Sequence, residues 1–125
     1  MALKARAAAA GGPPTEADLV DSHYAGKNAE LRPLYEAVLA RVHTLGPDIE
    51  LAPKKTYVSL RRSKQFALVG PAGGELEVCL VLPNATTTER LKPTTGMGTH
   101  TVRISDQSGL DDELVGWLRE AYERA

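Results

Sequence analysis

Apolar residues recur at three- and four-residue spacing in two parts of the chain. The first set is Leu31, Leu34, Tyr35, Val38, Leu39, Val42 and Leu45, and the second is Leu110, Leu114, Trp117, Leu118, Ala121 and Tyr122. This spacing puts each set on one side of an α-helix. We expect Asn28 and Ser108 to cap the two helices, because their side chains can accept hydrogen bonds from free backbone amides. Gly46 and Pro47 are expected to end the first helix.

The N-terminal part is predicted to hold a flexible leader and a short helix. Residues 1–14 are rich in Ala, Gly and Pro, which cannot bury enough surface to offset the entropy of ordering. Thr15 is followed three residues later by Asp18, the spacing of a capping box, so a helix is expected over residues 16–23. We therefore predict a leader over residues 1–14 and one domain over residues 15–125.

From residue 49 to residue 104 the helical period gives way to alternation of apolar and polar positions. Such alternation between Gly and Pro punctuation is typical of β-strands. The expected strands cover residues 56–61, 65–69, 75–82 and 100–104, with a long polar loop over residues 83–98. In residues 75–82, leucine and valine alternate with Glu75, Glu77 and Cys79, which indicates a sheet with one core face and one exposed face.

Together these elements predict an α+β fold in which two amphipathic helices cover one face of an antiparallel meander of four or five strands. The order is a short helix, a helix, the strands and a final helix. Among 125 residues, 42% hydrophobic and 25% charged, no apolar run approaches the roughly 20 residues that cross a bilayer, so no membrane span is expected. Cys79 is the only cysteine, which fits a reducing cytoplasm.

Charge is distributed unevenly along the chain. Residues 51–105 carry three acidic side chains and eight basic ones, which are Lys54, Lys55, Arg61, Arg62, Lys64, Arg90, Lys92 and Arg103. Residues 51–74 hold no acidic side chain at all. A phosphate contact needs a cation that no carboxylate neutralises, so the candidate anion-binding residues are Lys54, Lys55, Tyr57, Ser59, Arg61, Lys64, His100 and Arg103. The alternative is that these cations only discourage edge-to-edge pairing of strands.

Other chemistry has little support in the sequence. The three histidines fall in separate elements without a partner at ligand spacing, so we predict neither a metal site nor a bound cofactor. The favoured function is a non-catalytic binding module for an anion, possibly nucleic acid. One alternative is a small-ligand protein or enzyme that uses His100 as acid or base, Arg103 as anion clamp and the 83–98 loop as a wall. Another is a module for a protein partner or a second copy.

Several segments resemble a bacterial domain of unknown function, catalogue number five-six-five-five. They are DSHYAGK (residues 21–27), LRPLY (31–35), GPD (46–48), APKKTYVSLRRSKQFA (52–67), TH (99–100) with VR (102–103), and ELVGWLREAY (113–122). The resemblance extends over residues 21–124, and PKKTY is its most specific part. It implies the boundaries of the fold and a cytoplasmic bacterial setting, but no activity. The chain departs from the family pattern between residues 82 and 97, where only Arg90 and Leu91 match.

Overall fold

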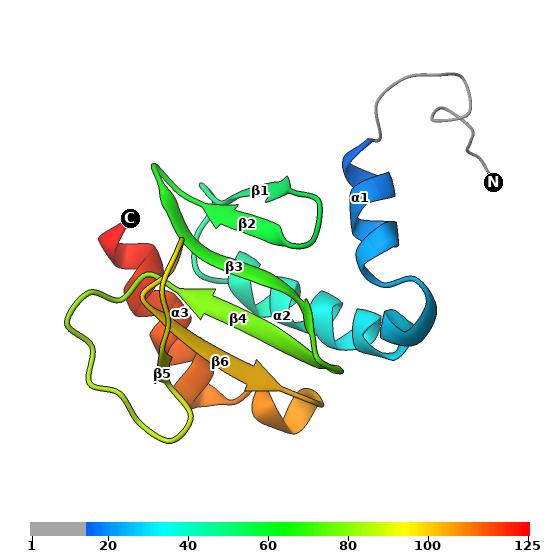
Figure 1. Ribbon diagram of the computed structural model, residues 1–125. Helices are drawn as coiled ribbons and strands as arrows, with labels where there is room; N and C mark the ends of the chain where they lie inside the picture. The colour runs from blue at the N-terminus through cyan, green and yellow to red at the C-terminus, as the bar shows by residue number, and fades with distance from the viewer. Residues whose placement is uncertain (1–14) are drawn as a thin grey trace.

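Helix α1 (Glu16–His23) begins at the predicted capping box. The structure is a computed structural model and describes residues 15–125, so the predicted leader lies outside the described residues (Figure 1). The Asp18 amide donates to Thr15 Oγ1 at 3.1 Å, and the Thr15 amide donates to Asp18 Oδ2 at 3.0 Å. Two otherwise unsatisfied amides at the helix start are thereby paired, which confirms this start.

Helix α2 (Arg32–His43) starts later than predicted, because a 3₁₀ helix, η2 (Gly26–Leu31), precedes it. Asn28 does not cap it. The Asn28 side-chain amide instead donates to the carbonyl of His23 at 3.1 Å, which closes the end of α1. Pro33 lies in the first turn of α2, where its missing N–H breaks no helical hydrogen bond.

Helix α3 (Asp112–Arg124) is also capped by a different residue from the one predicted. The Asp111 carboxylate accepts from the Leu114 amide at 3.0 Å. Ser108 lies one turn earlier, in the 3₁₀ helix η3 (Gln107–Gly109), and its amide donates to Asp106 at 2.9 Å. Both residues occupy cap-like sequence positions, and only the path of the chain distinguishes them.

The strands form one antiparallel sheet in the order β1-β2-β3-β4-β6-β5. Their bounds are β1 (Glu50–Pro53), β2 (Val58–Arg61), β3 (Gln65–Ala72), β4 (Glu75–Leu80), β5 (Lys92–Pro93) and β6 (His100–Ile104). The α+β class is confirmed, with six strands instead of four or five. The two that sequence patterns missed, β1 and β5, are short edge strands that each contain a proline, a residue tolerated at sheet edges.

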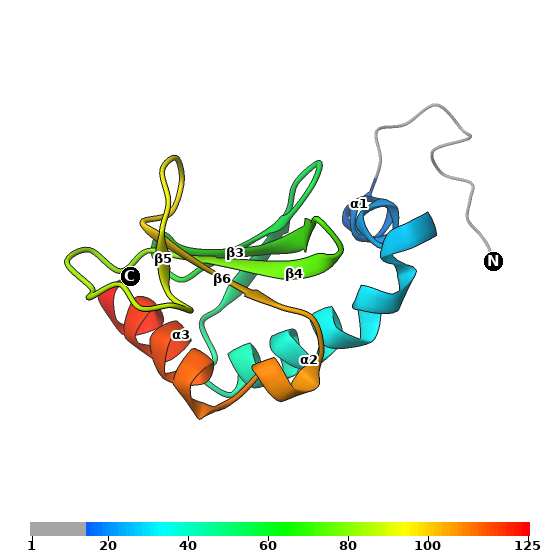
Figure 2. The same cartoon turned by 60° about the horizontal axis from the view of Figure 1, so that its bottom comes forward.

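Helices α2 and α3 both lie on one side of the sheet (Figure 2). Side chains that face them include Leu60, Val78 and Val102, all fully buried. Val38 and Val42 of α2 are fully buried as well, so the core is the layer between helices and sheet. Within residues 15–125, no helix is both long and apolar enough to cross a membrane.

Candidate anion-binding face

No helix of the described residues, 15–125, covers the sheet face opposite α2 and α3, and we call this face the open face (Figure 2). Strand register aligns Ser59, Leu68, Cys79 and Thr101 across it, from β2 to β6. These side chains alternate with the core residues, as the sequence pattern predicted. Two loops rise on this side of the sheet, the β1–β2 turn and the loop between β5 and β6 (Figure 2).

The β1–β2 turn presents two predicted cations, Lys54 and Lys55, both exposed. The turn is held from two directions. The Lys54 amide donates to the carbonyl of Tyr57 at 2.7 Å, which closes the hairpin. The Lys54 carbonyl lies 2.8 Å from Nε2 of His23, a buried side chain at the end of α1. These contacts fix the backbone, so both ammonium groups project from a defined position.

Tyr57 lies over the sheet beside this turn. A Cβ on Gly70 would lie 2.8 Å from the Thr56 carbonyl oxygen and 3.1 Å from Tyr57 Cβ, so only glycine on β3 allows so close an approach. The Tyr57 hydroxyl lies 3.2 Å from Met97 Sδ in the loop between β5 and β6. The two loops are therefore connected above the open face by a contact between these two side chains.

A small hollow of about 150 Å³ opens beside Tyr57. Its lining residues are Thr56, Tyr57, Leu68, Gly70, Pro71, Glu77 and Cys79. Burial raises the pKa of the Cys79 thiol. Because the thiolate is the nucleophile, this thiol is poorly suited to covalent chemistry.

Ser59 and Arg61 lie on β2, and only Arg61 is available to a ligand. Ser59 is fully buried, and its Oγ hydrogen bonds to Gln65 Oε1 at 2.5 Å. Arg61 is half-buried at the end of β2, opposite Glu50 of β1 and Gln65 of β3. Within residues 15–125, no carboxylate oxygen lies within the 4.0 Å ion-pair distance of Arg61.

The β4–β6 side of the open face is electrically balanced. Arg103 Nε lies 3.6 Å from Glu77 Oε2, and the same carboxylate oxygen accepts from the Thr101 hydroxyl at 3.0 Å. Arg103 is on the open face, as the anion-binding hypothesis requires, but its charge is partly satisfied by Glu77. The surplus of positive charge therefore lies on the β1–β2 side.

Two predicted site residues lie apart from the open face. His100 pairs in register with Leu80 and is buried on the helix side, where its Nδ1 lies 2.9 Å from Thr99 Oγ1. Lys64 lies in the β2–β3 turn, at the opposite end of β2 from Lys54 and Lys55. The structure thus brings Lys54, Lys55 and Tyr57 together, and places Arg61 at the far end of the same strand.

The lysines and arginines of residues 15–125 fall into two groups, those with an ion-pair partner and those without one. Arginines paired with carboxylates are Arg32, Arg41, Arg62, Arg90, Arg103 and Arg124. Side chains with no such partner in the described part of the chain are Lys27, Lys54, Lys55, Arg61, Lys64, Lys92 and Arg119. Arg62 and Arg90 counted toward the basic surplus in the sequence, yet their partners Asp48 and Asp111 neutralise them.

Sequence reasoning missed the part that Met97 plays at this face. Met97 is 54% exposed, the one large apolar side chain so exposed among the described residues. The available signal was a methionine flanked by Gly96 and Gly98 in a polar loop. Across residues 15–125, no group of three His, Cys, Asp or Glu side chains is placed to hold a metal ion.

Comparison with known proteins gives one match. The model of a family described as Domain of unknown function (DUF5655) matches residues 20–125. Neither the curated proteins nor the solved structures contain a match. The matched region includes every strand of the sheet, α2, α3 and the PKKTY segment that forms the β1–β2 turn. The resemblance seen in the sequence is confirmed, and the chain belongs to the DUF5655 family.

Proposed function

We propose that this domain is a non-catalytic binding module that holds an extended anion, such as single-stranded nucleic acid, across its open face. Its contacts are the cations Lys54, Lys55 and Arg61, which we call the basic margin. A strand rises about 3.3 Å per residue, so Arg61 lies roughly 13 Å from Tyr57 at the turn. Cations at both ends of one strand favour a ligand with several charges over a single small anion.

The observation that carries this proposal is that, within residues 15–125, no carboxylate oxygen lies within 4.0 Å of a cation of the basic margin, although Glu50 is the register partner of Arg61. Arg103 on β6, and Arg90 in the loop before β5, are already ion-paired. Binding of a phosphate chain depends on cations that release counterions from the ligand. The half-buried Tyr57 ring adds a surface on which a base can stack, as aromatic side chains do in single-strand binding proteins.

The enzymatic alternative has less support from the geometry. It requires His100 beside a pocket, but His100 is 7% exposed and faces the helix layer. Five hollows within residues 15–125 have linings that do not include His100. The Cys79 thiol, which lines the hollow beside Tyr57, has a pKa raised by burial. These observations favour binding over catalysis.

Fluorescence anisotropy with a labelled single-stranded oligonucleotide tests the proposal. The wild type should bind near 50 mM salt and weaken steeply toward 200 mM. Each lost phosphate contact reduces the slope of log K against log salt by about 0.7. K55A/R61A should therefore flatten that slope by about 1.4.

The matched control is K27A/R119A, which removes the same charge from the helical elements. It should leave the slope unchanged. The proposal would be overturned by no binding at low salt, or by an equal loss in both double variants.

A further inference from the structure

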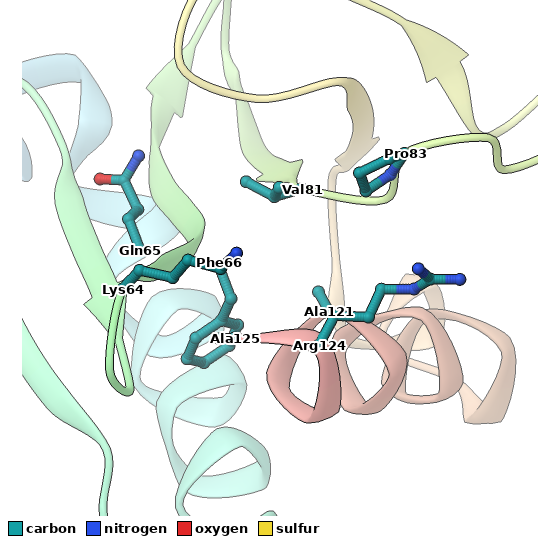
Figure 3. Close-up of a pocket in the computed structure, with 8 residues that line it drawn as sticks. All are labelled: Lys64, Gln65, Phe66, Val81, Pro83, Ala121, Arg124 and Ala125. Atoms are coloured by element: carbon teal, nitrogen blue, oxygen red, sulfur yellow. The ribbon is translucent and has the colours of Figure 1, made fainter.

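A second hollow, separate from the open face, lies where the β2–β3 turn and the end of β4 meet the last turn of α3 (Figure 3). Its volume is about 150 Å³. The residues that line it are Lys64, Gln65, Phe66, Val81, Pro83, Ala121, Arg124 and Ala125. None of them belongs to the basic margin.

Local irregularities of the sheet create this hollow. The register of β2 and β3 shifts between Leu60 and Arg61, so Phe66 has no register partner on β2. Phe66 is buried and packs edge-on against Tyr122 of α3, with ring centroids 5.8 Å apart. A bulge of this kind bends the strand and redirects a side chain.

Opposite Phe66, the hollow is lined mainly by small apolar side chains. The Val81 amide donates to the carbonyl of Phe66 at 3.0 Å, which holds the end of β4 beside β3. The chain then departs at Pro83, and the end of α3 lines the hollow with Ala121 and Arg124. The small side chain of Ala121 leaves the space between sheet and helix unfilled.

One unpaired cation faces this space. Figure 3 shows the Lys64 side chain extending toward the hollow above Phe66, whereas the guanidinium of Arg124 points away from Lys64. Arg124 is paired with Glu120 at 3.3 Å. For Lys64, the described residues supply no carboxylate oxygen within 4.0 Å. The side-chain oxygen of Gln65 already accepts a hydrogen bond from the Ser59 hydroxyl.

We infer that this hollow binds a small organic carboxylate. The carboxylate pairs with the Lys64 ammonium, and a compact apolar body contacts Phe66, Val81 and Ala121. The volume limits the size of that body, because about 150 Å³ is the space that a benzene ring occupies in a cavity. The positive charge of Lys64 favours a negatively charged ligand, because an ammonium group on the ligand would be repelled by Lys64.

Titration of ¹⁵N-labelled protein with benzoate, benzyl alcohol and benzylamine tests this inference. Benzoate should give saturable amide shifts at Phe66, Val81 and Ala121, and it should bind more tightly than the neutral alcohol. Benzylamine should give no saturable shift. Equal responses to the three probes, or no saturable shift with benzoate, would overturn the inference.

Two variants locate the contacts. K64M keeps the apolar stem of the side chain and removes the charge, so benzoate should bind about fivefold more weakly, the effect of one partly exposed ion pair. K27M, the matched control at an exposed lysine of η2 that also lacks a carboxylate partner within residues 15–125, should titrate like the wild type.

A121L fills the hollow and should abolish the benzoate shifts in a folded protein. If K64M binds benzoate as the wild type does, the inference is wrong whatever A121L shows. Failure here leaves the basic margin untouched, because the oligonucleotide experiment changes Lys55 and Arg61 only.

Discussion

The Tyr122 hydroxyl donates a 2.5 Å hydrogen bond to Asp48 Oδ1, which joins the last turn of α3 to the segment between α2 and β1. Arg62 completes the connection from the β2–β3 turn. Its Nε lies 2.9 Å from Asp48 Oδ2, and its guanidinium lies 4.4 Å from the centre of the Tyr122 ring. Three residues far apart in sequence thereby hold helix, linker and sheet together.

Removal of this hydroxyl should destabilise the fold. We expect Y122F to lower the free energy of unfolding by about 1 kcal/mol, the net contribution of one hydrogen bond, and somewhat more because its acceptor is charged. Urea denaturation measures the difference. Y24F is the matched control, because the Tyr24 hydroxyl is buried without a partner within residues 15–125. Its removal should be neutral or stabilising, and an equal loss in both variants would contradict this assignment.

Acid should weaken the same connection. The Tyr122 hydrogen bond, followed by Arg62, holds the pKa of Asp48 below its ordinary value of 3.8. A carboxylate whose pKa is lowered by folding stabilises the native state above its unfolded pKa, and this contribution is lost as pH falls through the folded pKa. The free energy of unfolding of D48N should therefore be lower than that of the wild type at about pH 7. The difference between the two should become smaller toward about pH 3. A gap that stays constant over this range would show that the charge of Asp48 contributes nothing.

Gly46 is expected to be intolerant of a side chain for a steric reason. A Cβ at this position would lie 2.7 Å from Cζ of Tyr122 and closer still to its hydroxyl oxygen. We expect G46A to cost about 1–3 kcal/mol, since the ring must move and its bond to Asp48 is lost. G116A is the control, because a Cβ there meets nothing within 4 Å. In the middle of α3 it should stabilise by roughly 0.5–1 kcal/mol. Equal effects of the two substitutions on thermal or urea unfolding would refute this reading.

The two candidate caps of α3 should differ in their contribution to stability. D111A removes the acceptor of the Leu114 amide and one partner of Arg90, so it should cost about 1–2 kcal/mol. S108A removes only a contact with Asp106 and should stay within about 0.5 kcal/mol of wild type. Circular dichroism melts of the two variants make the comparison, and a larger loss for S108A would reverse the assignment.

Periodicity was sufficient to predict the helices and the main strands. The leucine stripes and the alternation through Val78 and Leu80 report burial directly, and burial follows the period of the backbone. Short elements carry no such signal, so β1 and β5 were missed. The predicted cap of α3 was also wrong. Ser108 and Asp111 both have polar side chains near the start of the helix, so the sequence does not distinguish between them.

The candidate site was predicted only in part, because charge counts ignore contacts between distant segments. Sequence places Arg62 and Arg90 in the same surplus as Lys55 and Arg61, but tertiary pairing neutralises the first two. Strand alternation could have excluded His100, which shares the face of Val102. The contact between the Tyr57 and Met97 side chains joins the β1–β2 turn to the loop between β5 and β6. No local sequence pattern predicts it, because the two residues are 40 positions apart.

The central claim is that ligands meet this domain through the basic margin on the open face. Its most direct test is a backbone NMR titration of the ¹⁵N-labelled domain with a single-stranded oligonucleotide at low salt. The account predicts amide shifts concentrated over residues 54–61 and 68–71, with α2 and α3 unchanged. Shifts concentrated on the helices, or a spectrum that does not respond at all, would contradict it.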